Sequence, residues 1–183
     1  MIVVLGRPNV RQDGPHLRPA GLAVEIALAA AAEGARVEVV GSVGDDVGGD
    51  AVAVALGRAG IGHAALLRDA AAVTPGMATD IATGAGRLPG LEPGDVELGL
   101  RYLSDFSVIV LAEALSEEAQ AVVLEAAAYQ GAAVVAANDP EASGKTSELE
   151  RGVVVPRETD DDEASFARRA GQLAVRLERE SQS

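Results

Sequence analysis

The stretch Val37–Ile61 constrains the fold more than any other part of the chain. It reads VEVVGSVGDDVGGDAVAVALGRAGI: an apolar β-branched run, a glycine-rich turn with carboxylates, and a segment with helical spacing. A buried strand that leads through a short turn into a helix is the unit from which parallel sheets are built. We expect Asp45 or Asp46 to cap this helix and Gly60 to end it.

The same alternation of strand and helix recurs along the chain. We predict strands at 2–5, 36–43, 62–67, 108–112, 132–137 and 152–155, and helices at 20–33, 46–59, 93–103, 116–130 and 160–179. Helices of this length between strands imply right-handed crossovers. We therefore predict an α/β fold of three layers (α/β/α) around a mainly parallel sheet, as a single domain over 1–180 with a frayed end at 181–183.

Two stretches do not fit the alternation. Residues 7–19 are polar and rich in Pro and Gly, which predicts a loop, and residues 70–91 contain a turn at 74–76 and a candidate edge strand at 77–83. Asn138–Ser147 is predicted to be a further loop.

Signals at the helix ends support the predicted limits. Pro93 suits a first helical position, and Ser116 can cap the helix that ends at Gly131. Asp160 and Glu163 have the spacing of a capping box.

Composition excludes several classes of function. The net charge is −13 without a Lys/Arg cluster, so we expect neither nucleic acid nor an anionic membrane as a partner. Cysteine is absent, and His16 and His63 are isolated, so thiolate and histidine metal sites are not expected. The longest apolar run, 26–32, is too short to span a bilayer, and no signal peptide is visible, so a cytoplasmic location is expected.

Three motifs could suggest ligand binding, and each has a structural explanation. The loop Gly41–Gly49 could present N–H groups to an anion, but it lacks the G-x-G-x-x-G spacing and carries two aspartates. Gly144-Lys145-Thr146 resembles part of a phosphate loop, yet Asp139 stands where its first glycine belongs. The acidic runs at 45–50 and 160–163 lack the spacing of a calcium loop and suit helix caps, so no metal site is predicted.

Taken in order, these pieces resemble the PfkB/ribokinase-like carbohydrate kinases over about residues 1–177. The motifs that carry the resemblance are Pro8–Val10, Pro19–Val37, Val39–Gly49, Thr74–Gly76, Gly84–Gly86 and Val155–Asp160. The resemblance implies a minimal ribokinase-like fold. Family members transfer phosphate from ATP, with magnesium, to a sugar or nucleoside, and this is the activity that the resemblance implies.

Several positions depart from the family's pattern. Arg11 stands where the family has an aspartate, and Glu25 stands where its glycine-rich segment has an asparagine. Arg157 and Asp160 occupy the positions of the magnesium-linked Asn-x-x-Glu motif.

The family's Gly-Ala-Gly-Asp motif, whose aspartate acts as the base, has no counterpart in this sequence. Gly84-Ala85-Gly86 is followed by Arg87, and family members are markedly longer. The strands of the family's lid are expected to be shortened to 11–18 and 77–83.

The leading hypothesis is a catalytically inactive ribokinase-like protein that acts as a small-molecule-binding or protein-interaction module, with no catalytic residue, cofactor or metal. One alternative is a carbohydrate or nucleoside kinase that uses ATP and magnesium in a rebuilt or partner-completed site. The other is a structural, oligomer-forming protein. We expect a homodimer, since exposed sheet edges or helix faces need cover.

A ligand site in such a fold should lie at the carboxyl ends of the parallel strands. The candidate ligand-binding residues are Asn9, Arg11, Gly21, Glu25, Gly44, Asp45, Asn138 and Arg157. Arg11 and Arg157 would make part of this rim basic, which favours an anionic ligand. Gly41, Gly44, Asp45 and Gly48 are expected to shape the central turn.

Overall fold

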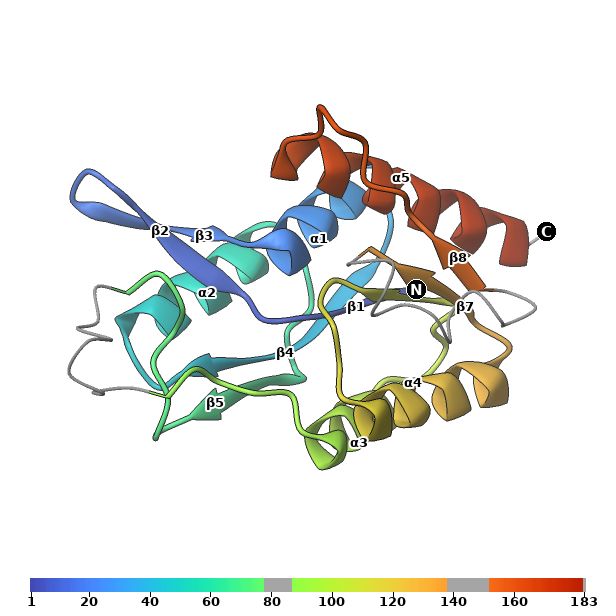
Figure 1. Cartoon of the computed structure of the whole chain (residues 1–183), viewed down its shortest axis with the longest axis horizontal. Coiled ribbons are helices and arrows are strands. Elements are labelled where there is room, and N and C mark those ends of the chain that lie inside the picture. Colours follow the sequence, from blue (N-terminus) through green and yellow to red (C-terminus); the bar gives the residue numbers. More distant parts are fainter. Residues whose placement is uncertain (78–86, 138–151, 183) are drawn as a thin grey trace.

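A parallel sheet of six strands runs through the middle of the protein, with helices on both faces (Figure 1). The computed structural model describes residues 1–77, 87–137 and 152–182. The strand order is β5-β4-β1-β6-β7-β8. These strands are β1 (Ile2–Leu5), β4 (Val37–Gly44), β5 (Leu66–Asp69), β6 (Val108–Leu111), β7 (Ala133–Ala136) and β8 (Gly152–Val154). The predicted fold class is confirmed.

The central strand β1 is buried on both faces, because helices cover both sides of a parallel sheet. Val4 lies between Val39 of β4 and Val110 of β6. Alternate residues of β1 point into separate apolar clusters: Ile2 and Val4 into one, Val3 and Leu5 into the other. Continuous runs of Val, Ile and Leu are therefore what these strands require.

Helices α1 (Leu22–Ala32), α2 (Val47–Arg58) and α5 (Glu163–Ser181) contribute to the cluster around Ile2 and Val4. Helices α3 (Pro93–Tyr102) and α4 (Glu117–Gln130) contribute to the cluster on the other face (Figure 1). Among the described helices, none is both long and apolar enough to cross a membrane.

Helices α1 and α5 approach closely because small residues face each other. A Cβ added at Gly171 of α5 would lie 3.0 Å from the Cβ of Ala29 and 3.1 Å from the carbonyl oxygen of Ile26. The start of β1 is tied to the same helix, since the Met1 ammonium lies 2.8 Å from the Glu178 carboxylate in a buried ion pair.

Residues 7–19 were predicted to form a loop and residue 20 to begin a helix, but 9–20 form an antiparallel hairpin of β2 (Asn9–Asp13) and β3 (His16–Ala20). The loop prediction was wrong because these strands lie mostly outside the core, and Val10 and Ala20 are their only fully buried residues. Pro19 is tolerated because β3 belongs to a two-stranded ribbon. The hairpin includes residues 11–18, where a shortened lid strand was expected. The other lid strand was expected at 77–83, and 78–83 lie outside the described residues.

The third parallel strand lies later in the chain than predicted. β5 spans Leu66–Asp69, whereas the prediction was 62–67. The chain first contacts β4 at Gly62, whose N–H donates to Val37 and whose carbonyl accepts from Val39, both at 2.9 Å. It then leaves β4 and returns to pair with residues 41–44.

Helix α5 is capped by Asp162, and the predicted capping box of Asp160 and Glu163 was wrong. The Asp162 carboxylate accepts a hydrogen bond from the Ser165 N–H at 2.7 Å. The Asp161 carboxylate accepts a hydrogen bond from the Glu158 N–H, which precedes the helix, at 2.8 Å. Ser116, Gly131 and Pro93 take their predicted places at the ends of α4 and α3.

The contact between α1 and α5 predicts an effect on stability. Gly171→Leu should lower the free energy of unfolding by about 1–3 kcal/mol, because the added atoms meet main chain that cannot move aside. Chemical denaturation monitored by circular dichroism measures the change. Gly94→Leu in α3 is the control, since no described atom lies within 4 Å of a Cβ added there. Equal losses in the two variants would contradict this account of the packing.

Candidate functional site

The candidate site lies at the edge of the sheet where the parallel strands end. The β2–β3 hairpin leaves β1 at this edge and leads into α1 through Gly21 (Figure 1). Between the ends of β1 and β6, the Arg7 N–H donates to the Glu113 carboxylate at 3.1 Å, and the Arg7 side chain lies 3.5 Å from the same oxygen. The hairpin, the start of α1 and the start of α5 form this rim.

Asn9 lies directly against the start of α1. Gly21 has a φ of +92°, and a Cβ added to it would lie 2.6 Å from Asn9 Nδ2. Gly21 is the residue before α1, and no described side chain accepts a hydrogen bond from the first turn of this helix. The Asn9 carboxamide therefore lies next to a helix start that has no side-chain cap. Asn9 and Gly21 are therefore neighbours at this rim.

Arg11 and Glu25 lie beside the first turn of α5. Arg11 Nη2 is 3.9 Å from Glu163 Oε1, and both side chains are exposed. Burial raises the pKa of Glu25, and the negative charges of Glu163 and Asp162 add to the rise, while Arg11 offsets part of it. Arg11 is paired with Glu163, and Glu25 feels the charges of Glu163 and Asp162 as well as that of Arg11, so carboxylates outnumber guanidinium groups around Glu25.

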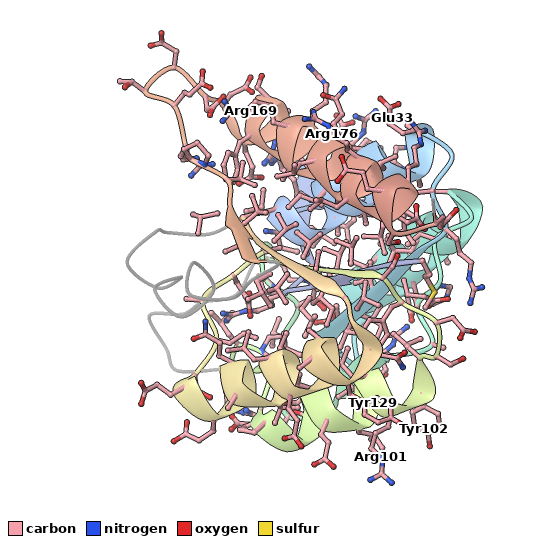
Figure 2. All side chains as sticks on the ribbon, turned by 90° about the vertical axis from the view of Figure 1, so that its right-hand side faces the viewer. Glu33, Arg101, Tyr102, Tyr129, Arg169 and Arg176 are labelled. Carbon is pink, nitrogen blue, oxygen red and sulfur yellow. The ribbon has the colours of Figure 1, made fainter. Side chains whose placement is uncertain are left out.

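Arg157 stacks on an aromatic ring. Its guanidinium lies 4.8 Å above the centre of Phe166, and Arg169 approaches the same ring at 5.9 Å. Arg169, labelled in Figure 2, also pairs with Glu158 and Asp161 and donates to the Pro156 carbonyl at 2.9 Å. These contacts hold the segment before α5 and fix Arg157 at its start.

Asp46, and not Asp45, organises the turn between β4 and α2. Asp46 Oδ1 accepts from the Gly49 N–H at 2.8 Å and from the Thr74 hydroxyl at 2.7 Å, and Oδ2 accepts from the Thr74 N–H at 2.8 Å. The Gly44 N–H donates to the same Thr74 hydroxyl at 3.0 Å. Asp45 is exposed, 4.0 Å from Arg68. We call the contacts among Gly44, Asp46 and Thr74 the aspartate–threonine brace.

The brace is connected to the hairpin. The carbonyl of Pro75, next to Thr74, accepts from the Val10 N–H at 2.8 Å. Gly76 has a φ of +86°, and a Cβ added there would lie 1.7 Å from the Val10 carbonyl oxygen, so only glycine fits. The turn after β4 therefore supports the strand that carries Asn9 and Arg11.

The structure brings together four of the eight predicted residues at the hairpin and the start of α1: Asn9, Arg11, Gly21 and Glu25. Of the other four, Gly44 belongs to the brace, Asp45 lies toward Arg68, and Arg157 lies on the ring of Phe166. Asn138 is outside the described residues. Three contacts were not predicted: Glu163 beside Arg11, Asp162 beside Glu25, and Thr74 as the partner of Asp46. The sequence offered no signal that separates Asp46 from Asp45, because each aspartate has a glycine N–H three residues later that it could cap.

Several solved structures share this architecture. A putative ribokinase II from E. coli matches with a TM-score of 0.59 at 14% identity, over 96% of this chain and 59% of that one. Fructokinase from Xylella fastidiosa matches with a TM-score of 0.52 at 18% identity, over 74% of this chain and 51% of that one. Aminoimidazole riboside kinase from Salmonella enterica matches with a TM-score of 0.51 at 17% identity, over 74% of this chain and 48% of that one. The chain has a ribokinase-like fold.

This ribokinase-like chain spans about half the length of the solved structures it matches. No protein-family model and no curated protein matches its sequence. At these identities the likeness establishes the fold, and it confirms at that level the resemblance on which the sequence analysis rested. Among the residues that the structure describes, no group of three or more His, Cys, Asp or Glu side chains is placed to hold a metal ion.

The brace predicts a dependence of stability on pH. Burial alone would raise the pKa of Asp46, but hydrogen bonds from Thr74 and Gly49 outweigh it, and the pKa lies below its usual value. A carboxyl whose pKa is depressed in the folded state stabilises the protein above its unfolded pKa of about 3.9, and this contribution disappears as the pH falls through the folded pKa.

Asp46→Asn should lower the free energy of unfolding by about 1–3 kcal/mol at neutral pH, because an amide cannot accept all three hydrogen bonds. The difference from wild type should shrink below about pH 4. Urea denaturation across this pH range measures both effects. Asp45→Asn is the matched control and should change stability by less than about 0.5 kcal/mol. A larger effect at Asp45 than at Asp46 would reverse the assignment.

Proposed function

We propose that this ribokinase-like chain binds a small hydroxyl-rich molecule at the rim formed by the hairpin and the starts of α1 and α5, without transferring phosphate to it. One observation carries the proposal. The scaffold of the rim is intact, with the aspartate–threonine brace beneath the hairpin and Asn9 against Gly21. The positions that the family resemblance assigns to sugar and magnesium instead carry Arg11, Glu25 and Arg157.

The chemistry of the rim favours a neutral or cationic ligand. Hydroxyl groups donate and accept hydrogen bonds, so they match a cluster in which the Arg11 guanidinium only donates and the ionised Glu25 and Glu163 carboxylates only accept. A phosphate or carboxylate ligand would be repelled by Glu25, Asp162 and Glu163. This proposal replaces the anionic ligand expected from Arg11 and Arg157 in the sequence.

The same substitutions argue against phosphoryl transfer by this chain. Transfer depends on metal ions and positive groups that are positioned on the phosphoryl group. Arg157 stands where the resemblance places an asparagine linked to magnesium, and a guanidinium has no lone pair to offer a cation. Its position on Phe166 supports a structural role at the start of α5. Arg11 likewise replaces a carboxylate that could accept a hydrogen bond from a sugar hydroxyl.

A screen of ligands tests the proposal. Sugars, polyols, nucleosides and amino sugars are added singly to the pure chain, with and without ATP and magnesium, and the melting temperature is measured. A ligand that binds only the folded state raises it, and calorimetry then gives the affinity. We expect a neutral or cationic hydroxylated compound to bind equally well without ATP. Magnesium-dependent formation of ADP with any of these compounds would overturn the proposal, and so would preferential binding of sugar phosphates.

Glu25→Gln separates binding from stability. Because burial and neighbouring carboxylates raise the pKa of Glu25, its ionised form destabilises the folded chain above that pKa. The neutral amide should therefore raise the melting temperature at pH 7. It should also raise the dissociation constant of the ligand at least about tenfold, since a hydrogen bond to a charged group is lost. Glu180→Gln, at an exposed position near the far end of α5, is the control for both measurements. A variant that is less stable and binds normally would contradict the role of Glu25.

A further inference from the structure

A groove opens between the ends of α3 and α4, away from the rim. It encloses about 590 Å³, and its apolar lining includes Leu100, Leu103, Phe106, Val122 and Ala126. Leu100, Leu103 and Phe106 are buried beneath it. The segments that follow α3 and α4 lead into the starts of β6 and β7, so the groove lies at the edge of the sheet opposite to the candidate site.

Tyr129 lines this groove, and Tyr102, the other tyrosine of the sequence, lies next to Arg101 and Leu103 of the lining. Tyr102 of α3 is 75% exposed and Tyr129 of α4 is 89% exposed. Figure 2 shows the two side chains with Arg101 at the ends of the neighbouring helices. Tyrosine and arginine are enriched among the residues that contribute most to protein interfaces. In a chain with only 2% aromatic residues, two exposed tyrosines beside one apolar groove mark a contact surface.

The surface is complementary to itself. It carries projecting rings next to a hollow, and its lining includes Arg101 together with Glu97 and Glu125. Arg101 and Glu97 form an ion pair at 3.6 Å in which both side chains are exposed. Such a pair contributes little to stability, so each side chain can pair instead with a charge on a second copy. A two-fold contact needs this combination, because each element must meet its complement on the second copy.

We propose that two copies of this chain associate through the groove between α3 and α4, with Tyr129 of each copy seated in the groove of the other. The arrangement leaves both candidate ligand sites open, because they lie at the opposite edge of each sheet. It goes beyond the proposed function and does not depend on it.

Salt distinguishes a second copy from a basic partner. Each copy carries a net charge of −13, so long-range repulsion opposes dimerisation and salt should strengthen it. The binding of a basic protein or peptide in the groove would instead weaken as the salt concentration rises.

Sedimentation velocity over a range of concentrations, at low and high salt, tests the proposal. We expect wild type to approach the mass of a dimer, and more readily at high salt. Tyr102→Ala with Tyr129→Ala should raise the dissociation constant at least about tenfold. Val54→Ser on α2 is the control, since this exposed valine lies on the other face of the sheet, and it should leave the dissociation constant unchanged.

A cross-link locates the interface. The chain lacks cysteine, so Ser104→Cys places one thiol at the groove, and a bifunctional maleimide should join two copies. Val54→Cys should give no cross-linked dimer. A monomer at every concentration, or a dimer that the tyrosine substitutions leave intact, would overturn the proposal. Dimerisation that weakens with salt, or cross-linking only through residue 54, would do the same.

Discussion

The hydrogen bonds around Asp46 and Thr74 are the constraint on which the rim of this structure depends. A single carboxylate caps α2, holds the Thr74 turn and, through the Thr74 hydroxyl, connects to the end of β4. The Thr74 side chain is almost fully buried, so removal of its partner would leave polar atoms without water. Because the next carbonyl binds the hairpin, this local brace also determines where Asn9 and Arg11 stand.

The glycines of this turn follow from the same constraint. A Cβ added at Gly44 would lie 2.6 Å from the Asp46 carboxylate and 2.7 Å from the Thr74 nitrogen. A Cβ added at Gly49 would lie 2.3 Å from the Gly44 carbonyl oxygen. The glycine-rich signature is explained by packing within the brace, and it needs no phosphate to account for it.

Local patterns predicted the parts of the fold that local forces determine. Buried runs such as Ile2–Leu5 and Val108–Leu111 can be recognised because both faces of the sheet are covered. The hairpin was missed because its strands bury little, and β5 was misplaced because the chain touches β4 at Gly62 before it pairs. Neither error changed the predicted fold class.

The site was less predictable because its contacts join distant segments. Asp45 and Asp46 are equally good caps by sequence, and only Thr74, 28 residues away, decides between them. The acidic surroundings of Arg11 come from α5, at the other end of the chain, so the charge of the rim could not be inferred from the hairpin. Side chains that meet across the fold require its three-dimensional structure.

Hydrogen exchange at the Val10 amide tests the role of the brace most directly. This N–H binds the Pro75 carbonyl, so its protection reports whether the Thr74 turn holds the hairpin. We expect Asp46→Ala to reduce the protection of the Val10 amide strongly and to leave the amides of β6 and β7 protected. Unchanged protection at Val10 in that variant would show that the hairpin is held by other contacts and would contradict the account.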